Sequence, residues 1–116
     1  MKGWELIQAE RQRQIEKEDW TAEHDAHPHP EDLKRAAECY VIADGPDAMI
    51  PAGWPWAAKW WKPKDRQRNL ERAGALYLAA ADLAVSMGKH VMAKGLKDNA
   101  LRCAHSINQL PFGPIG

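Results

Sequence analysis

The pattern of apolar and polar positions along the chain predicts helices and no strands. Apolar residues recur at the three- and four-residue spacing of a helix face in four stretches, at about residues 4–17, 30–43, 66–87 and 89–105. The third stretch is the clearest, because Asp65 is placed to cap its N-terminus and Gly88 to end it. Gly95 weakens the fourth. The pattern predicts an all-α fold, a small three- to four-helix domain with a long loop rich in Trp and Pro at residues 45–64.

The predicted elements divide the chain into two parts. We expect residues 1–88 to form the helical core domain, and residues 89–116 to supply a C-terminal helix followed by an extended tail. A terminal segment of this kind is ordered when it docks on something. One interpretation of the tail is therefore an arm that docks on a partner subunit in a homo-oligomer.

The predicted first helix has a polar residue inside its apolar face. Trp4, Ile7 and Ile15 define that face, and Arg11 occupies the position between the last two. An arginine at such a position snorkels to water, pairs with a carboxylate or meets an anionic ligand. The candidate carboxylate partners are three acidic residues close by in the chain: Glu10, Glu16 and Glu18.

The formal net charge is zero, with 16 basic and 16 acidic side chains, but the charges are unevenly distributed. Residues 1–32 carry four basic and nine acidic side chains, whereas residues 59–72 carry six basic and two acidic ones. A balanced chain is not expected to bind nucleic acid in general, which needs a basic surplus. The two segments either attract each other, within the fold or between subunits, or the basic one faces an anionic ligand.

Composition and spacing exclude several other classes. No apolar run approaches the roughly 20 residues that span a bilayer, and the N-terminus lacks the apolar core of a signal peptide. Cys39 and Cys103 are too few for a disulfide framework and match no zinc spacing. We therefore expect a cytoplasmic protein with two reduced thiols and no membrane partner.

Four of the six tryptophans fall within eight residues of the loop, at Trp54, Trp56, Trp60 and Trp61. One interpretation is a core role, because each indole buries roughly 150–250 Å². The other is a rigid aromatic wall for a planar ring, since stacking stabilises nucleic-acid complexes by roughly 1–3 kcal/mol per base. Five cations in or just after this segment suit the phosphate of a nucleotide-like ligand: Lys59, Lys62, Lys64, Arg66 and Arg68.

The polar loop before the second helix carries five metal- or ligand-binding groups: Glu23, His24, Asp25, His27 and His29. Imidazole and carboxylate groups bind divalent metals, but this spacing fits no zinc signature. Three interpretations stay open. The loop holds a metal, or His24 or Asp25 hydrogen-bonds a ligand or orients Arg11, or the loop is plainly solvated.

Motifs of common enzymes are missing. The chain has no Gly-rich phosphate loop, no nucleophile elbow and no Cys-x-x-Cys motif, which favours a non-enzymatic protein without a cofactor. One enzymatic alternative is a Mg²⁺-dependent nucleotide pyrophosphohydrolase of the all-α class. The carboxylates available for its metal ions lie in the N-terminal part of the chain: Glu10, Glu16, Glu18, Glu23 and Asp25.

Several motifs together resemble a family of small proteins encoded by phages and prophages. They are ERQRQIE at residues 10–16, WTAEHD at 20–25, LKRAAECY at 33–40, WPW at 54–56, WWKP at 60–63 and AGAL at 73–76. The resemblance covers about residues 4–85, and the chain has Asp19 where the family usually has glycine. The chain is also similar to the ryanodine-receptor repeat domain, through Trp20 near a helix end and Asp65-Arg66 at a helix start.

Small phage accessory proteins often counter host defence, and some sequester nucleotide second messengers, usually as homo-oligomers. The resemblance therefore implies a non-enzymatic protein of the host cytoplasm that binds a nucleotide-derived anion. The aromatic wall is assigned to Trp20, Trp54, Trp56, Trp60 and Trp61. Phosphate contacts are assigned to Arg11, Lys62 and Arg66, and ribose or base contacts to His24 and Asp25. An alternative is an inhibitor or adaptor that binds a host defence protein through the Trp loop.

Overall fold

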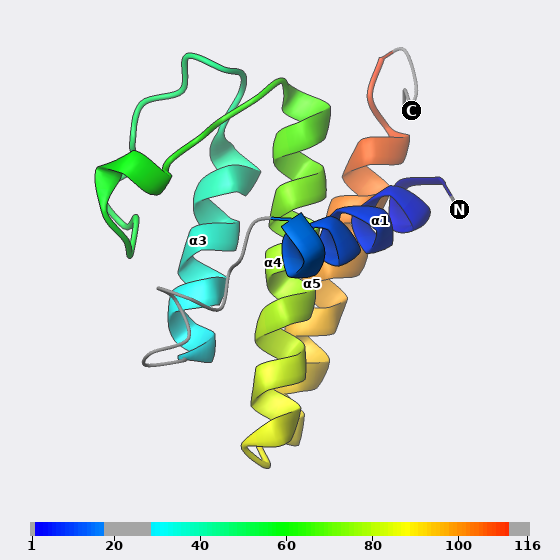
Figure 1. Cartoon of the computed structure of the whole chain (residues 1–116). Helices are drawn as coiled ribbons and strands as arrows, with labels where there is room; N and C mark the ends of the chain where they lie inside the picture. Colours follow the sequence, from blue (N-terminus) through cyan, green and yellow to red (C-terminus); the bar gives the residue numbers. More distant parts are fainter. Residues whose placement is uncertain (1, 18–28, 112–116) are drawn as a thin grey trace.

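The computed structural model describes residues 2–17 and 29–111 (Figure 1). Within these residues it contains four α-helices, one 3₁₀ turn and no strand, which confirms the all-α prediction. The α-helices are α1 (Lys2–Lys17), α3 (Pro30–Ile42), α4 (Arg66–Ser86) and α5 (His90–Asn108), and the 3₁₀ turn is η1 (Ala58–Trp60). No helix in this part of the chain is long and apolar enough to cross a membrane.

Helix α4 is the centre of the fold. Figure 1 shows α3 and α5 along its sides and α1 crossing in front of α4 and α5. Every residue of α4 from Asn69 to Tyr77 is buried, because three other helices surround this half of it. The core consists mainly of small and aliphatic side chains, so the helix axes approach closely and a few large residues fill the remaining space.

The ends of α4 are those expected from the sequence. The Asp65 side chain accepts a hydrogen bond from the backbone N–H of Arg68 at 2.9 Å, as an N-cap does. At the other end Gly88 adopts φ 76°, and the N–H of Lys89 donates to the carbonyl of Ala84 at 2.8 Å. This Schellman arrangement reverses the chain and sets α5 against α4.

The predicted apolar face of α1 was right at Trp4 and Ile7 but wrong at Ile15. Ile7 is fully buried as expected, but Ile15 is 53% exposed. Glu10 and Gln14 are buried in its place, and these lie three and seven positions after Ile7. The second half of the buried face of α1 is therefore polar, and apolar periodicity could not reveal it. Arg11 lies beside this face and not within it.

Two glycines allow α1 to approach its neighbours. A Cβ atom built at Gly74 of α4 would lie 2.7 Å from Cγ1 of Ile7, so only glycine permits this crossing. At the N-terminal end of α1, Gly3 donates its backbone N–H to Oδ1 of Asn108 at 3.0 Å. A side chain at Gly3 would collide with the backbone of Ala104 in α5. Helix α1 is thus in close contact with α4 at Gly74 and with α5 at Gly3.

Helix α5 continues through Gly95 without interruption, and Gly95 is exposed on it. Its buried residues, among them Leu96, Ala100 and Ile107, belong to the same hydrophobic cluster as those of α1, α3 and α4. Residues on both sides of position 88, where the sequence suggested a division, therefore share one core.

Candidate functional site

Three of the loop tryptophans pack against the core: Trp54, Trp56 and Trp61. The ring of Trp61 stacks on buried Tyr40 of α3 with centroids 4.8 Å apart, and Trp54 meets Tyr40 edge-on at 5.7 Å. Trp61 Nε1 donates to the carbonyl of Ala48 at 2.9 Å. These indoles therefore hold the long loop against α3, the core role considered for them from the sequence.

Trp60 differs from its neighbours in the loop. It lies in η1, it is half-buried, and it does not belong to the set that packs on the hydrophobic cluster. The ammonium groups of Lys59 and Lys62 lie 5.4 and 5.8 Å from the centre of its ring, within the range of cation–π attraction. An aromatic ring with two cations close to it is the combination expected for a planar anion. We call these three residues the Trp60 platform.

The backbone of Lys62 is held from two sides. Its N–H donates to the hydroxyl of Tyr40 at 3.2 Å, and its carbonyl accepts from the guanidinium of Arg72 at 3.4 Å. Arg72 is buried, and its guanidinium carbon lies 5.8 Å from the centre of the Tyr40 ring. The platform is therefore attached to α3 and α4 through its own main chain.

Arg66, which the sequence assigned to phosphate contact, is the first residue of α4, and its side chain reaches the C-terminal end of α3. Its Nη1 donates to the carbonyls of Val41 and Ala43, the latter at 3.0 Å. The side chain of buried Asn69 also donates to Ala43, at 3.1 Å. Arg66 and Asn69 thus donate to carbonyls that the end of a helix leaves without partners. The Nη1 atom of Arg66 is therefore used to stabilise the fold.

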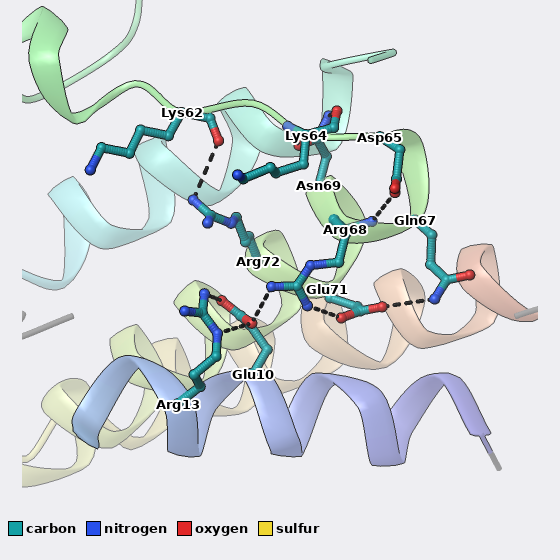
Figure 2. A network of polar contacts seen from close by, with 10 residues as sticks. All are labelled: Glu10, Arg13, Lys62, Lys64, Asp65, Gln67, Arg68, Asn69, Glu71 and Arg72. Atoms are coloured by element: carbon teal, nitrogen blue, oxygen red, sulfur yellow. Dashed lines mark hydrogen bonds and ion pairs between the residues drawn. The ribbon is translucent and has the colours of Figure 1, made fainter. Parts of the chain in front are cut away.

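A buried network of charges joins α1 to α4 on the side of the Trp60 platform (Figure 2). The carboxylate of Glu10 accepts hydrogen bonds from Arg13 at 2.7 and 3.0 Å and from Arg68 at 3.0 Å. Arg68 also bonds Glu71, whose second oxygen accepts from Gln67 at 2.9 Å. The side chains of Glu10 and Glu71 are only 1% and 4% exposed. We call these five residues the Glu10 network.

The charges within the Glu10 network stabilise one another. Burial by itself lowers the pKa of Arg68, but the carboxylates of Glu10 and Glu71 outweigh it and raise the pKa above its ordinary value. Sequence reasoning missed this network, although one signal was present. Glu10 precedes Arg13, and Arg68 precedes Glu71, by the three positions that bring helical side chains together.

Arg11 points to the other side of the α1–α4 crossing. Its Nη2 lies 3.5 Å from the carboxylate of Asp82 in α4, which is not one of the candidate partners named from the sequence. Consecutive residues of a helix point about 100° apart, and Glu10 therefore faces Arg68 while Arg11 faces Asp82. The Nε atom of Arg11 is buried and makes no hydrogen bond within the part of the chain that the structure describes.

Arg11 lines an open groove of about 600 Å³ between α1, α4 and α5. Its other walls include Trp4 of α1, Leu78 and Asp82 of α4, and two lysines of α5, Lys94 and Lys97. The structure therefore separates two residues that the sequence placed in one site. Arg11 belongs to this groove, whereas Lys62 belongs to the Trp60 platform. We call the cavity the α1–α5 groove.

Three of the predicted site residues, Trp20, His24 and Asp25, lie outside the described residues. Residues 2–17 and 29–111 contain no group of three or more His, Cys, Asp or Glu side chains arranged to hold a metal ion. Glu10, one of the carboxylates considered for Mg²⁺, is engaged by Arg13 and Arg68.

Both cysteines are buried and free. Burial raises the pKa of the Cys103 thiol to about 12, against a smaller opposing effect of Arg66. Burial, with a contribution from Glu38, also raises the pKa of Cys39. Since the thiolate is the reactive form of cysteine, neither residue is suited to nucleophilic or redox chemistry.

The chain matches no protein-family model, and no curated protein or solved structure aligns with it significantly. The function must therefore be argued from the sites themselves.

Proposed function

We propose that the protein binds a small anion with a planar group, a nucleotide or a nucleotide-derived second messenger, and does not transform it. The observation that carries this proposal is the Trp60 platform. Trp60 is not among the loop indoles that pack on the core cluster, and the ammonium groups of Lys59 and Lys62 lie over its ring. A base that stacks on such a ring gains roughly 1–3 kcal/mol, and two ammonium groups attract its phosphate.

The rigidity of the platform supports the same function. Hydrogen bonds from Lys62 to Tyr40 and from Arg72 to Lys62 fix the main chain next to Trp60. Pro55 and Pro63 further restrict the loop on both sides of η1. A site that is ordered before binding loses less conformational entropy when the ligand arrives, which increases its affinity.

The resemblance to small phage proteins suggests what such binding would achieve. A non-enzymatic protein in the host cytoplasm that sequesters a nucleotide second messenger would blunt a host defence response. Sequestration requires affinity and abundance but no catalytic group, which agrees with the commitment of Glu10 and Glu71 to arginine partners. A homo-oligomer would present several platforms at once.

The test is a panel of mono-, di- and cyclic nucleotides, with thermal shift and tryptophan fluorescence as the measurements. A binding nucleotide is expected to raise the melting temperature and quench the indole emission. The double variant Lys59→Glu/Lys62→Glu should weaken binding by about tenfold or more, which corresponds to about 1.4 kcal/mol. The matched control is Lys89→Glu/Arg102→Glu, which makes the same change of charge at exposed positions outside the platform and the α1–α5 groove.

Two results would contradict the proposal. One is the absence of any thermal shift across the whole panel. The other is equal weakening by the two double variants, because that would indicate attraction to overall charge and no defined platform.

A second candidate function is supported by exposed apolar residues in the same loop. Met49 is 87% exposed and Ile50 is 47% exposed, and they are neighbours in the chain. Exposed apolar side chains next to each other favour a protein contact, either with a host defence protein or with a second copy of this chain. Native mass spectrometry of the wild type and of Met49→Ser/Ile50→Ser tests this. A complex or oligomer that the substitutions disrupt would support an adaptor role, and a monomer free of partner in both would exclude it.

A further inference from the structure

We propose that the α1–α5 groove is a second binding site, separate from the Trp60 platform, for a compact amphipathic acid. Such a ligand has an apolar body of one or two rings and a single anionic group. The cavity of about 600 Å³ lies within the range of about 300–1,000 Å³ that is usual for small-molecule sites. This inference does not depend on the proposed function of the Trp60 platform.

The apolar body of the ligand is matched by one wall of the groove. Trp4 is half-buried and lines the cavity together with Leu78, Val85 and Ala93. Val85 is 51% exposed, so this apolar wall is in contact with solvent when the groove is empty. Covering it with an aromatic or aliphatic group would remove apolar surface from water, which is favourable.

The anionic group is matched by three cations from two helices. Arg11 comes from α1, while Lys94 and Lys97 stand three positions apart on α5 and therefore on the same face. Among the described residues of the lining Asp82 is the one carboxylate, which leaves a net charge of +2 among these four groups. Cations gathered without enough carboxylates repel one another, and an incoming anion relieves that repulsion.

Arg11 is poised to take part in binding. Its pairing with Asp82 is weak, because the two atoms are 3.5 Å apart and the Asp82 side chain is 74% exposed. Its buried Nε has no hydrogen-bond acceptor in the described part of the chain. A carboxylate that entered beside Arg11 would offer the paired acceptor oxygens that a guanidinium prefers.

The groove and the platform lie on different parts of α4. Arg72 contacts the loop of the platform and Asp82 lines the groove, and the ten residues between them correspond to ~15 Å along the helix axis. Substitutions of exposed lysines at one site are therefore expected to leave the other intact.

The experiment uses three probes of nearly the same shape: 2-naphthoate, the neutral 2-naphthalenemethanol and the cationic 2-naphthylmethylammonium. Binding is measured by chemical-shift titration of backbone amides in the wild-type chain. We expect 2-naphthoate to bind with a Kd of about 1 mM or tighter, the affinity typical of a ligand of this size. The shifts should concentrate in residues 4–11 and 93–97. The alcohol should bind about tenfold more weakly, and the ammonium should not bind measurably.

Two double variants complete the test. Lys94→Glu/Lys97→Glu should weaken 2-naphthoate binding at least tenfold, and both positions are exposed, so the fold is expected to tolerate them. Lys89→Glu/Arg102→Glu, the same change of charge at exposed positions outside both sites, should leave naphthoate affinity within about twofold of the wild type. The proposal is overturned if the three probes bind equally, if the α5 variant binds 2-naphthoate as well as the wild type, or if 2-naphthoate causes no shift at 5 mM.

Discussion

Glu10 and Arg11 are adjacent in the chain, but they lie on opposite sides of the α1–α4 crossing and in very different surroundings. Glu10 is buried and receives hydrogen bonds from two arginines. Arg11 lines an open groove, where its pairing with an exposed Asp82 is long. On one side every charged group of the network has an opposite charge close to it. On the other side cations outnumber carboxylates.

This difference separates charges that hold the fold from charges available to a ligand. A buried carboxylate that already binds two arginines is not available to a ligand. Removing it would leave the two cations without a negative charge beside them. An exposed cluster of cations around an apolar wall adds little to stability, since water and salt screen it. Function is therefore expected on the Arg11 side and at the Trp60 platform, and stability on the Glu10 side.

The largest expected effect on stability comes from the Glu10 network. Glu10→Gln should lower the free energy of unfolding by about 3 kcal/mol, because it removes the negative charge between Arg13 and Arg68. We expect the low end of the range for a broken buried pair, since both arginine side chains are 35% exposed and water reaches them. Urea denaturation followed by circular dichroism measures the change.

The control for this variant is Glu5→Gln, the same change of charge on the same helix at an exposed position. It should cost less than about 1 kcal/mol, the usual contribution of a charge in the first turn of a helix. Equal losses for the two variants would mean that the Glu10 network contributes no more than general electrostatics.

The next largest effect on stability concerns the crossing of α1 and α4, on the two sides of which Glu10 and Arg11 lie. Gly74→Ala should destabilise the protein by about 1–3 kcal/mol, because the new Cβ would lie 2.7 Å from Cγ1 of Ile7 and push α1 away from α4. Gly95→Ala is the matched control, because a Cβ at exposed Gly95 meets nothing within 4 Å. That variant should gain about 0.5–1 kcal/mol from helix propensity. Thermal denaturation of both variants would refute the idea if Gly74→Ala were as stable as Gly95→Ala.

The helices were predictable from the sequence, whereas the two sides of α1 were not. Residues such as Asp65 and Gly88 act within their own segment, so local rules identify them. The buried face of α1 departs from the apolar pattern at Glu10 and Gln14, and Glu10 is buried with a partner, Arg68, from a distant part of the chain. Polar residues are buried only where the tertiary structure satisfies them, and one segment read alone does not contain that information.

The candidate sites show the same limit. The cluster of Trp and Lys in the loop was visible in the sequence, but the separation of Trp60 from the three core tryptophans depends on where Tyr40 lies. The groove requires three helices to converge, and Trp4 is 90 residues away in the chain from Lys94. Arg11 was noticed as an anomaly, and its surroundings could be identified only from the fold.

A smaller loss of stability is expected at alkaline pH. The arginines of the Glu10 network and of the groove stay charged there, so the loss reports on a buried thiol of the core. The pKa of Cys103 rises from 9.0 to about 12 on folding, so the folded protein keeps a proton that the unfolded chain loses. The resulting stability is fully present below pH 9 and is lost progressively between pH 9 and 12. At pH 10 the loss is about 1.4 kcal/mol. Cys103→Ala should remove this contribution, and an unchanged pH profile in that variant would assign the loss to other groups, such as Tyr77.

The smallest expected change in stability is at Arg11 in the α1–α5 groove, and it provides the direct contrast with Glu10. Arg11→Gln removes a single long ion pair to an exposed carboxylate, so the free energy of unfolding should fall by less than about 0.5 kcal/mol. The same variant should weaken 2-naphthoate binding about fivefold, because Arg11 is one of three cations in the groove. Urea denaturation and the amide titration measure the two quantities separately. A loss of stability comparable to that of Glu10→Gln, with unchanged naphthoate affinity, would place Arg11 among the residues that hold the fold and remove the distinction between the two sides.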